Sequence, residues 1–408
     1  MTTSAVVQPE QVAPAPTDRR AYLMLAMAAV GFTINFWAWA LISPLAIRFK
    51  GDLGLTSFQQ ALLVAVPVIV GSVGRIPVGA LTDRLGGRIM FPAVSFATIV
   101  PVLFLGLLGH DSYAMLLLGG FFLGIGGTAF AVGVPFVNGW FPPHRRGFAI
   151  GVFGAGMGGT AISALTTVKL AKAHGLSSPF LITAAALAAY GILAVLVLRD
   201  PVGRAASTGS VLKRLGDTIR LRVTWQMSAL YAVGFGGYVA FSVYLPTYLK
   251  TAYGLTQTDA ANKMAGFVLV AVIMRPVGGW LCDRLAPSTV LTVVFAIVSL
   301  CALVQSTSPA LKPGSTIAFL TMAASLGTAS GAVFALVAKL SPPAKVGAVT
   351  GVVGAAGGLG GFVPPLVMGS VYGSTGSYAI GLVLLSITAA AATVFTATAV
   401  RRASHRHA

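Results

Sequence analysis

Residues 65–87, AVPVIVGSVGRIPVGALTDRLGG, hold an arginine inside a long apolar run and end near an Asp-Arg pair. The same order returns at residues 268–285, VLVAVIMRPVGGWLCDRL. Arg75 and Arg275 are 200 positions apart, and each precedes its Asp-Arg pair by eight positions. A charge at the centre of a bilayer costs at least ~2.5–3.5 kcal/mol. Two such charges at matching positions therefore indicate an internal repeat that holds something negative.

The composition is that of a polytopic membrane protein. Hydrophobic residues make up 56% of the chain and charged residues 9%, whereas a soluble domain carries about 25% charged residues. The mean hydropathy is +0.87. Glycine occurs 49 times in 408 residues, which favours close packing of helices in a membrane. We expect an all-α protein with transmembrane helices and no soluble core.

Twelve apolar segments are long enough to cross a ~30 Å hydrocarbon core. They are residues 21–47, 58–82, 89–109, 113–140, 147–171, 179–198, 224–249, 258–282, 288–307, 314–338, 346–371 and 377–399. The longest polar interruption divides them into two groups of six. The predicted organisation is a disordered cytoplasmic tail (1–20), an N-terminal six-helix bundle (21–198), a cytoplasmic linker (199–222), a C-terminal six-helix bundle (223–400) and a cytoplasmic tail (401–408).

The basic residues predict the orientation. Most of the 27 Lys and Arg residues fall in the two tails and in the loops that would share a side with them. Cytoplasmic loops of membrane proteins collect Lys and Arg. We therefore expect a multi-pass protein of the cell membrane with both termini in the cytoplasm. The net charge of +18 is explained in this way without a nucleic-acid partner.

The two halves repeat when the sequence is shifted by 200 positions. The shift places Arg75 on Arg275, and Asp83-Arg84-Leu85 on Asp283-Arg284-Leu285. It also superimposes two prolines (142–143 on 342–343) and three glycines (151, 154 and 158 on 351, 354 and 358). Two parallel six-helix halves with a site between them near the midplane are typical of major facilitator proteins. We predict two pseudo-symmetric halves in this arrangement.

The mid-span arginines have no acidic partner in the sequence at their own depth. The chain has only 9 Asp and Glu residues, and none of them falls in the middle of a predicted span. A guanidinium presents five donors in a planar fork that suits an oxyanion. We therefore expect Arg75 and Arg275 to bind substrate rather than to form a buried ion pair.

The loop GALTDRLGGR (79–88) resembles the signature loop of the major facilitator superfamily, and GGWLCDRL (278–285) is its counterpart in the second half. The resemblance implies structural and gating roles for Asp83, Arg84, Asp283 and Arg284. It does not specify the substrate.

Two glycine-rich runs, GVFGAGMGGTAIS (151–163) and GVVGAAGGLGGFVPP (351–365), complete a second resemblance. With the two arginines they resemble the nitrate/nitrite porter family, over nearly the whole chain from Phe32. That family often carries an asparagine between the glycines of the first run, where this chain has Met157 and Gly158. The resemblance implies a flat anion held between the arginines. The implied site residues are Arg75, Arg275, Tyr231 as a hydrogen-bond donor, the rings of Phe36, Phe130 and Phe235, and Gly154, Gly158, Gly354 and Gly358.

The expected function is transport of nitrate or nitrite by alternating access. Exchange of one anion for the other is favoured, since two uncompensated arginines make an empty carrier slow to reorient. A proton-coupled nitrate symporter and a small-carboxylate exchanger of the oxalate/formate type remain alternatives. An intramembrane enzyme would need paired acids or a His-Glu-x-x-His helix, neither of which the sequence has. We expect a monomer in the lipid bilayer whose partner is a small inorganic anion, with no cofactor and no metal.

Overall fold

The computed structural model describes residues 19–142, 145–201, 216–341 and 346–400. Within these residues the chain forms helices and no strands, and twelve helical segments are long and apolar enough to cross a membrane. The all-α fold with twelve spans is therefore confirmed. Residues 1–18 of the predicted tail 1–20, the tail 401–408 and most of the linker 199–222 lie outside the described residues, while Arg19 and Arg20 begin the first helix. The boundaries of the two bundles stay predictions.

The first six spans contain ten α-helices and two short 3-10 segments. In chain order they are α1 (Arg19–Trp39) with α2 (Ile42–Leu53), α3 (Ser57–Val73) with α4 (Arg75–Leu85), α5 (Gly87–Leu107), α6 (Tyr113–Leu123) with η1 (Gly124–Thr128) and α7 (Ala129–Trp140), α8 (Arg146–Gly154) with η3 (Ala155–Gly158) and α9 (Gly159–His174), and α10 (Ser178–Val197).

The last six spans are interrupted less often. They are α12 (Arg222–Tyr253), α13 (Gln257–Arg284), α14 (Pro287–Ser306), η4 (Leu311–Ser315) with α15 (Thr316–Leu340), α16 (Val346–Gly360) with α17 (Val363–Thr375), and α18 (Ala379–Phe395) with η6 (Thr396–Val400).

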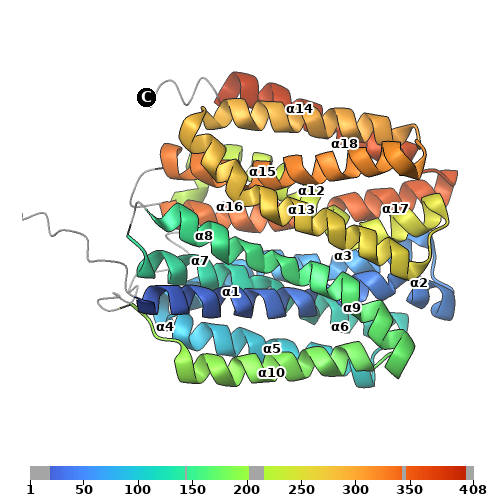
Figure 1. Cartoon of the computed structure of the whole chain (residues 1–408), viewed down its shortest axis with the longest axis horizontal. Coiled ribbons are helices and arrows are strands. Elements are labelled where there is room, and N and C mark those ends of the chain that lie inside the picture. Colours follow the sequence, from blue (N-terminus) through green and yellow to red (C-terminus); the bar gives the residue numbers. More distant parts are fainter. Residues whose placement is uncertain (1–18, 143–144, 202–215, 342–345, 401–408) are drawn as a thin grey trace, which may run out of the picture.

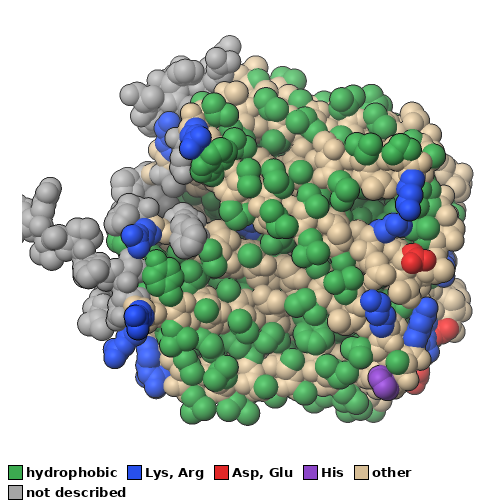
Figure 2. All heavy atoms as spheres, viewed as in Figure 1, with side chains coloured by type: hydrophobic (Ala, Val, Ile, Leu, Met, Phe, Trp, Pro, Cys, Tyr) green, Lys and Arg blue, Asp and Glu red, His purple; other side chains and the backbone are tan. Residues whose placement is uncertain are grey.

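The spans run alongside one another as one elongated bundle (Figure 1). Most of the N-terminal helices, blue to green, lie in the lower part of the view, and most of the C-terminal helices, yellow to red, in the upper part. The start of α1 and the C-terminal end of the chain lie at the same end of the bundle (Figure 1). We call the opposite end the distal end. Hydrophobic side chains cover the flank between the ends, and the charged side chains seen on this face gather toward the two ends (Figure 2). Such a flank suits a lipid environment.

The second span of each half begins with the same type of cap. Thr56 Oγ1 accepts a hydrogen bond from the Gln59 N–H at 3.2 Å, and the Thr56 N–H donates to Gln59 Oε1 at 2.9 Å. In the other half, Thr256 Oγ1 accepts from the Asp259 N–H at 3.1 Å. These bonds satisfy N–H groups that a helix leaves unpaired at its start. The spans that carry the two arginines therefore start at equivalent positions of the repeat.

Glycine lets the arginine-bearing spans approach their neighbours backbone to backbone. A Cβ atom added to Gly127, in η1, would lie 2.9 Å from the Cα of Gly71 in α3. A Cβ atom added to Gly331, in α15, would lie 2.2 Å from the carbonyl oxygen of Arg275 in α13. Any larger residue would push these helices apart. The close contacts keep both arginines near the centre of the bundle.

Hydrogen bonds join the two halves at the distal end. Ser43 Oγ donates to the carbonyl of Val243 at 2.6 Å, and Gln60 Nε2 donates to Thr247 Oγ1 at 3.1 Å. Lys172 Nζ also donates to Thr258 Oγ1 at 3.0 Å. The two halves are therefore closed against each other at this end.

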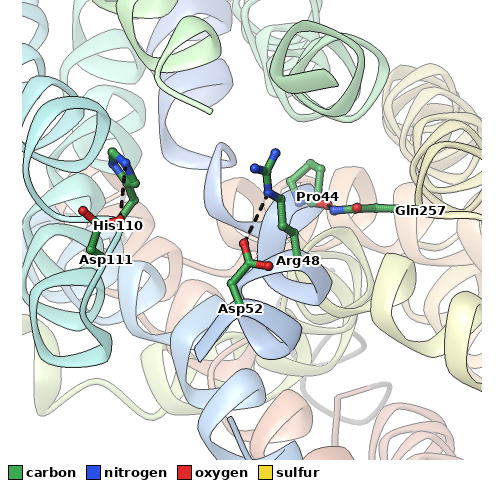
Figure 3. A network of polar contacts seen from close by, with 6 residues as sticks. All are labelled: Pro44, Arg48, Asp52, His110, Asp111 and Gln257. Atoms are coloured by element: carbon green, nitrogen blue, oxygen red, sulfur yellow. Dashed lines mark hydrogen bonds and ion pairs between the residues drawn. The ribbon is translucent and has the colours of Figure 1, made fainter. Parts of the chain in front are cut away.

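Figure 3 shows a further distal bond, from Gln257 Nε2 to the carbonyl of Pro44 at 2.6 Å. The same view shows the ion pair between Arg48 Nε and Asp52 Oδ2 at 3.3 Å, both side chains being partly exposed. Arg48 and Asp52 belong to α2, which lengthens the first span beyond the predicted 21–47 to Leu53. Hydropathy did not predict this last turn because its side chains are polar.

Candidate functional site

The two mid-span arginines are buried at the boundary between the halves. Arg75 is the first residue of α4, directly after the helix break at Gly74. Arg275 lies within α13. Each is 7% exposed. Lys and Arg are almost never this buried without a partner, so the atoms around each guanidinium decide what the site can do.

Arg75 reaches across to the C-terminal half. Its Nη1 donates to the carbonyl oxygen of Gly354 in α16 at 2.7 Å. Its Nε also makes a long contact of 3.4 Å to the carbonyl of Gly127 within its own half. Both acceptors are backbone carbonyls exposed by glycine. The positive charge is therefore solvated by neutral dipoles.

Arg275 reaches across in the opposite direction. Its Nη1 contacts the sulfur of Met157 in η3. Its Nη2 donates to the hydroxyl of Tyr231 in α12 at 2.8 Å. A Cβ atom added to Gly154 would lie 3.7 Å from the Arg275 side chain. Each arginine thus touches the glycine-rich run of the other half, as the pseudo-symmetry of the sequence requires.

Two phenylalanine rings lie close to both guanidinium groups. The centre of the Phe130 ring is 5.2 Å from Cζ of Arg75 and 5.8 Å from Cζ of Arg275. The Phe235 ring is 5.6 Å from each of them. Tyr231 stacks on Phe235 with centroids 4.9 Å apart and planes 5° apart. Rings at these distances attract cations, so they stabilise both positive groups.

The remaining residues of the predicted site lie close by. Phe36 is fully buried and lines a small cavity together with Arg75 and Gly358. Gly354 lies against Phe130, where an added Cβ would be 3.6 Å from the ring. At Gly158, by contrast, an added Cβ would meet open space. The structure therefore brings the arginines, rings and three of the four glycines together, and it leaves Gly158 without a side-chain neighbour.

Neither guanidinium forms an ion pair within the described part of the chain. Elsewhere, Arg48 pairs with Asp52, and His110 Nε2 lies 3.6 Å from Asp111 Oδ1, both at the distal end. Nη2 of Arg75 and Nε of Arg275 also make no hydrogen bond to a described residue. The site can therefore donate hydrogen bonds from two neighbouring cations to a ligand.

The residues predicted to act as a gate lie away from this centre. Asp83 and Arg84 are exposed in the last turn of α4. The Arg284 guanidinium lies 4.3 Å from the centre of the Trp280 ring at the end of α13. The side chain of Asp283 lies outside the described residues.

Two residues of the site were not predicted from the sequence. The Phe334 ring lies 4.7 Å from Tyr231 and 6.4 Å from Phe130. The second is Ser72, which lines the cavity beside Arg75. The sequence did contain a signal for Phe334. The shift of 200 positions pairs Phe130 with Ser330, and Phe334 lies one helical turn after Ser330.

The geometry defines a polytopic membrane protein with an anion-compatible site between two repeated halves. The sequence profile of the Major Facilitator Superfamily matches residues 28–365. A bacterial homologue of the human lysosomal transporter Spinster, crystallised in an inward-facing and occupied conformation, superimposes with a TM-score of 0.71 at 18% identity. The superposition covers 96% of this chain and 98% of that one.

Relatives with higher sequence identity show which family of this superfamily the chain belongs to. The probable nitrate/nitrite transporter NarK2 of Mycobacterium tuberculosis is 50% identical over 89% of this chain and 93% of its own length. The nitrite extrusion protein of Bacillus subtilis is 37% identical over 92% and 93%. The probable nitrate transporter NarT of Staphylococcus haemolyticus is 33% identical over 89% and 93%. The chain belongs to the major facilitator superfamily and, within it, to the nitrate/nitrite porter family.

Proposed function

We propose that this protein carries nitrate and nitrite across the cell membrane and exchanges one for the other. The names of its relatives support the substrates. The observation that carries the proposal is the pair of buried guanidinium groups, Arg75 and Arg275, which lack an acidic partner among the described residues. An anion between them would supply the missing negative charge.

The shape of the site suits a small planar oxyanion. Guanidinium donors lie in a plane and form paired hydrogen bonds to oxyanions. Nη2 of Arg75 and Nε of Arg275 are available for this purpose, and Tyr231 offers a hydroxyl already bonded to Arg275. The flat rings of Phe130 and Phe235 lie against both cations, with their centres 5.2–5.8 Å from each Cζ. A bulky solute would need these rings to move.

Alternating access follows from the contacts across the boundary. Arg75 bonds to Gly354 and Arg275 contacts Met157, so both arginines link the two halves. An anion that binds both guanidinium groups would draw the halves together around itself, and its release would allow them to rock apart. We place the distal end outside the cell, with Asp83, Arg84, Asp283 and Arg284 as gating residues at the cytoplasmic end.

Exchange follows from the charge of the empty site. Without an anion, the hydrogen-bond acceptors that the described part of the chain offers the two cations are the Gly354 and Gly127 carbonyls, a thioether and a phenol. A thioether is a weak acceptor, so the empty site is poorly compensated and should reorient slowly. A bound anion removes that penalty in both directions of transport, which couples entry of one anion to exit of another.

The proposal is tested with purified protein in liposomes preloaded with nitrite. External nitrate should enter rapidly, and entry should be slow when the liposomes contain no exchangeable anion. Fast entry into empty liposomes that requires an acid exterior would instead establish proton symport, with Tyr231 as the suspected proton route. Oxalate and formate, offered in place of nitrate, should fail to exchange; rapid exchange of either would support the small-carboxylate alternative.

A further inference from the structure

A buried hydrogen bond joins the two halves next to the arginine pair. It links the hydroxyl of Tyr238, in α12, to Oγ1 of Thr160, in α9, at 3.2 Å. Tyr238 is 1% exposed, and Thr160 is fully buried. Thr160 Oγ1 also donates its single proton to the Met157 carbonyl at 2.9 Å. Tyr238 is therefore the donor to Thr160, and two consecutive hydrogen bonds lead across the boundary between the halves.

Both ends of this chain of hydrogen bonds contact the candidate site. The ring of Tyr238 stacks on Phe235, with centroids 5.9 Å apart and planes 24° apart. The Phe235 ring in turn lies 5.6 Å from Cζ of each arginine. At the other end, the sulfur of Met157 contacts Nη1 of Arg275. A shift of either side chain when an anion binds would therefore reach the bond between Tyr238 and Thr160.

The bond lies on the distal side of the arginines. The α12 helix runs toward the distal end, and Tyr238 follows Phe235 by three residues, a rise of about 4.5 Å. Val243 and Thr247, which bond to the N-terminal half at 2.6 and 3.1 Å, follow further along the same helix. Of these three bonds between α12 and the other half, the one made by Tyr238 is nearest to the anion site.

The repeat contains this hydroxyl pair once. The shift of 200 positions pairs Tyr238 with Ala38 and Thr160 with Gly360. Neither alanine nor glycine has a side-chain donor or acceptor, so the equivalent contact cannot form a side-chain hydrogen bond. Two halves related by an axis along the membrane normal present such positions at the same depth. A single bond at this depth is therefore a single point at which the distal closure can be released.

We propose that Tyr238 and Thr160 form a latch, a bond that holds the distal side closed next to the anion site and sets the balance between the outward-open and inward-open states. The inference rests on the proposed function for the transported anion and for the distal end facing outside. While the bond is made, α12 and α9 stay together. When it breaks, the halves separate on that side and an external anion reaches the arginines. Tyr238 acts on the balance of states without touching the anion, so it is a positioning residue.

The test removes the bond from each half in turn. Tyr238→Phe deletes the hydroxyl and keeps the ring on Phe235, and Thr160→Val deletes the other hydroxyl and keeps the side-chain shape. External KM for nitrate is measured in cells that lack their own nitrate carriers, and internal KM in inverted membrane vesicles. Apparent affinity at a face depends on the fraction of protein open to that face. Loss of one hydrogen bond should raise the ratio of internal to external KM about two- to tenfold in both variants.

Two control variants separate the latch from a general effect of lost hydroxyls. Tyr248→Phe removes a buried hydroxyl that accepts from Gln305 Nε2 at 2.9 Å, within the C-terminal half. It should leave the ratio of the two KM values unchanged, because it joins nothing across the boundary. Thr160→Ser keeps the hydroxyl and should keep the wild-type ratio. A direct contact with the anion would instead raise both KM values together.

Each remaining outcome decides against the latch. An unchanged ratio in Tyr238→Phe and Thr160→Val, with nitrate exchange intact in wild type, would overturn it and leave the transport function standing. An equal rise of KM at both faces would overturn it as well, because it would place the hydroxyls in the anion site. If neither deletion variant inserts while Thr160→Ser and Tyr248→Phe do, the bond serves folding and the latch is refuted.

Thiol labelling tests the latch without any transport. In a chain carrying Cys282→Ser and Cys301→Ser, the substitution Ser43→Cys places a thiol at the distal closure, where Ser43 is 3% exposed. A membrane-impermeant maleimide added outside should label it about two- to tenfold faster when Tyr238→Phe is also present. The control Asp52→Cys, at an exposed distal position, should be labelled at one rate in both backgrounds. Equal rates at position 43 would contradict the latch, whereas absence of nitrate and nitrite movement by wild type would overturn only the proposed function.

Discussion

Replacing Arg275 by lysine should abolish exchange while leaving the protein inserted. The substitution keeps the positive charge and removes the planar fork. Arg275 Nη2 donates to Tyr231 at 2.8 Å, and Nε has no described partner and is available to the anion. A lysine ammonium cannot make both contacts in one plane.

The size of the effect follows from the bonds that are lost. A hydrogen bond to a charged group contributes about 1.5–3 kcal/mol, and each 1.4 kcal/mol corresponds to roughly a tenfold change in Kd. Loss of a single bond to the anion therefore predicts a Kd for nitrate roughly 10 to 100 times higher. Arg75→Lys should behave in the same way, because its Nη1 bond to Gly354 at 2.7 Å orients the fork.

The assay is nitrate/nitrite counterflow in liposomes, combined with nitrate binding to the protein in detergent. Arg48→Lys is the matched control, because Arg48 pairs with Asp52 at the distal end, where both side chains are partly exposed and such pairs contribute about 0–1 kcal/mol. It should exchange nitrate as wild type does. Near-normal counterflow by both Arg75→Lys and Arg275→Lys would refute the paired-arginine site.

Three further predictions concern the rings, the glycines and the coupling. Phe130→Leu should raise the KM for nitrate several-fold with little loss of thermal stability. Leucine fills the space but lacks the ring that contacts both cations, and such a contact contributes about 0.5–2 kcal/mol. An unchanged KM would show that Phe130 serves only packing. Gly331→Ala should lower the melting temperature and stop transport, because the new Cβ would lie 2.2 Å from the Arg275 carbonyl oxygen. The control is Gly266→Ala, whose new Cβ would meet open space; this variant should have the melting temperature of wild type. Nitrate entry into nitrite-loaded liposomes should not change when a pH gradient is imposed, and a strong dependence on that gradient would argue against pure exchange.

The spans, the repeat and the depth of the arginines could be predicted from the sequence. Membrane insertion depends on the local run of apolar residues, so the twelve spans follow from composition along the chain. The predicted ends differ by a few residues where polar side chains extend a helix, as from Arg48 to Leu53 in α2. The breaks at Gly74 and in the 3-10 segments η1 and η3 were not predicted, since hydropathy does not report backbone geometry.

The partners of the site residues were decided only by the tertiary structure. Arg75 bonds to a carbonyl 279 positions away, and Arg275 to a sulfur 118 positions away. No local pattern encodes such contacts, because they depend on how the two halves rotate against each other in the bundle. The packing of Ser72 arises in the same way, because its hydroxyl lies against Gly358 of the opposite half, where an added Cβ would be 2.1 Å from Oγ. The chain determines which charges enter the membrane, and the packing of the halves determines what those charges can hold.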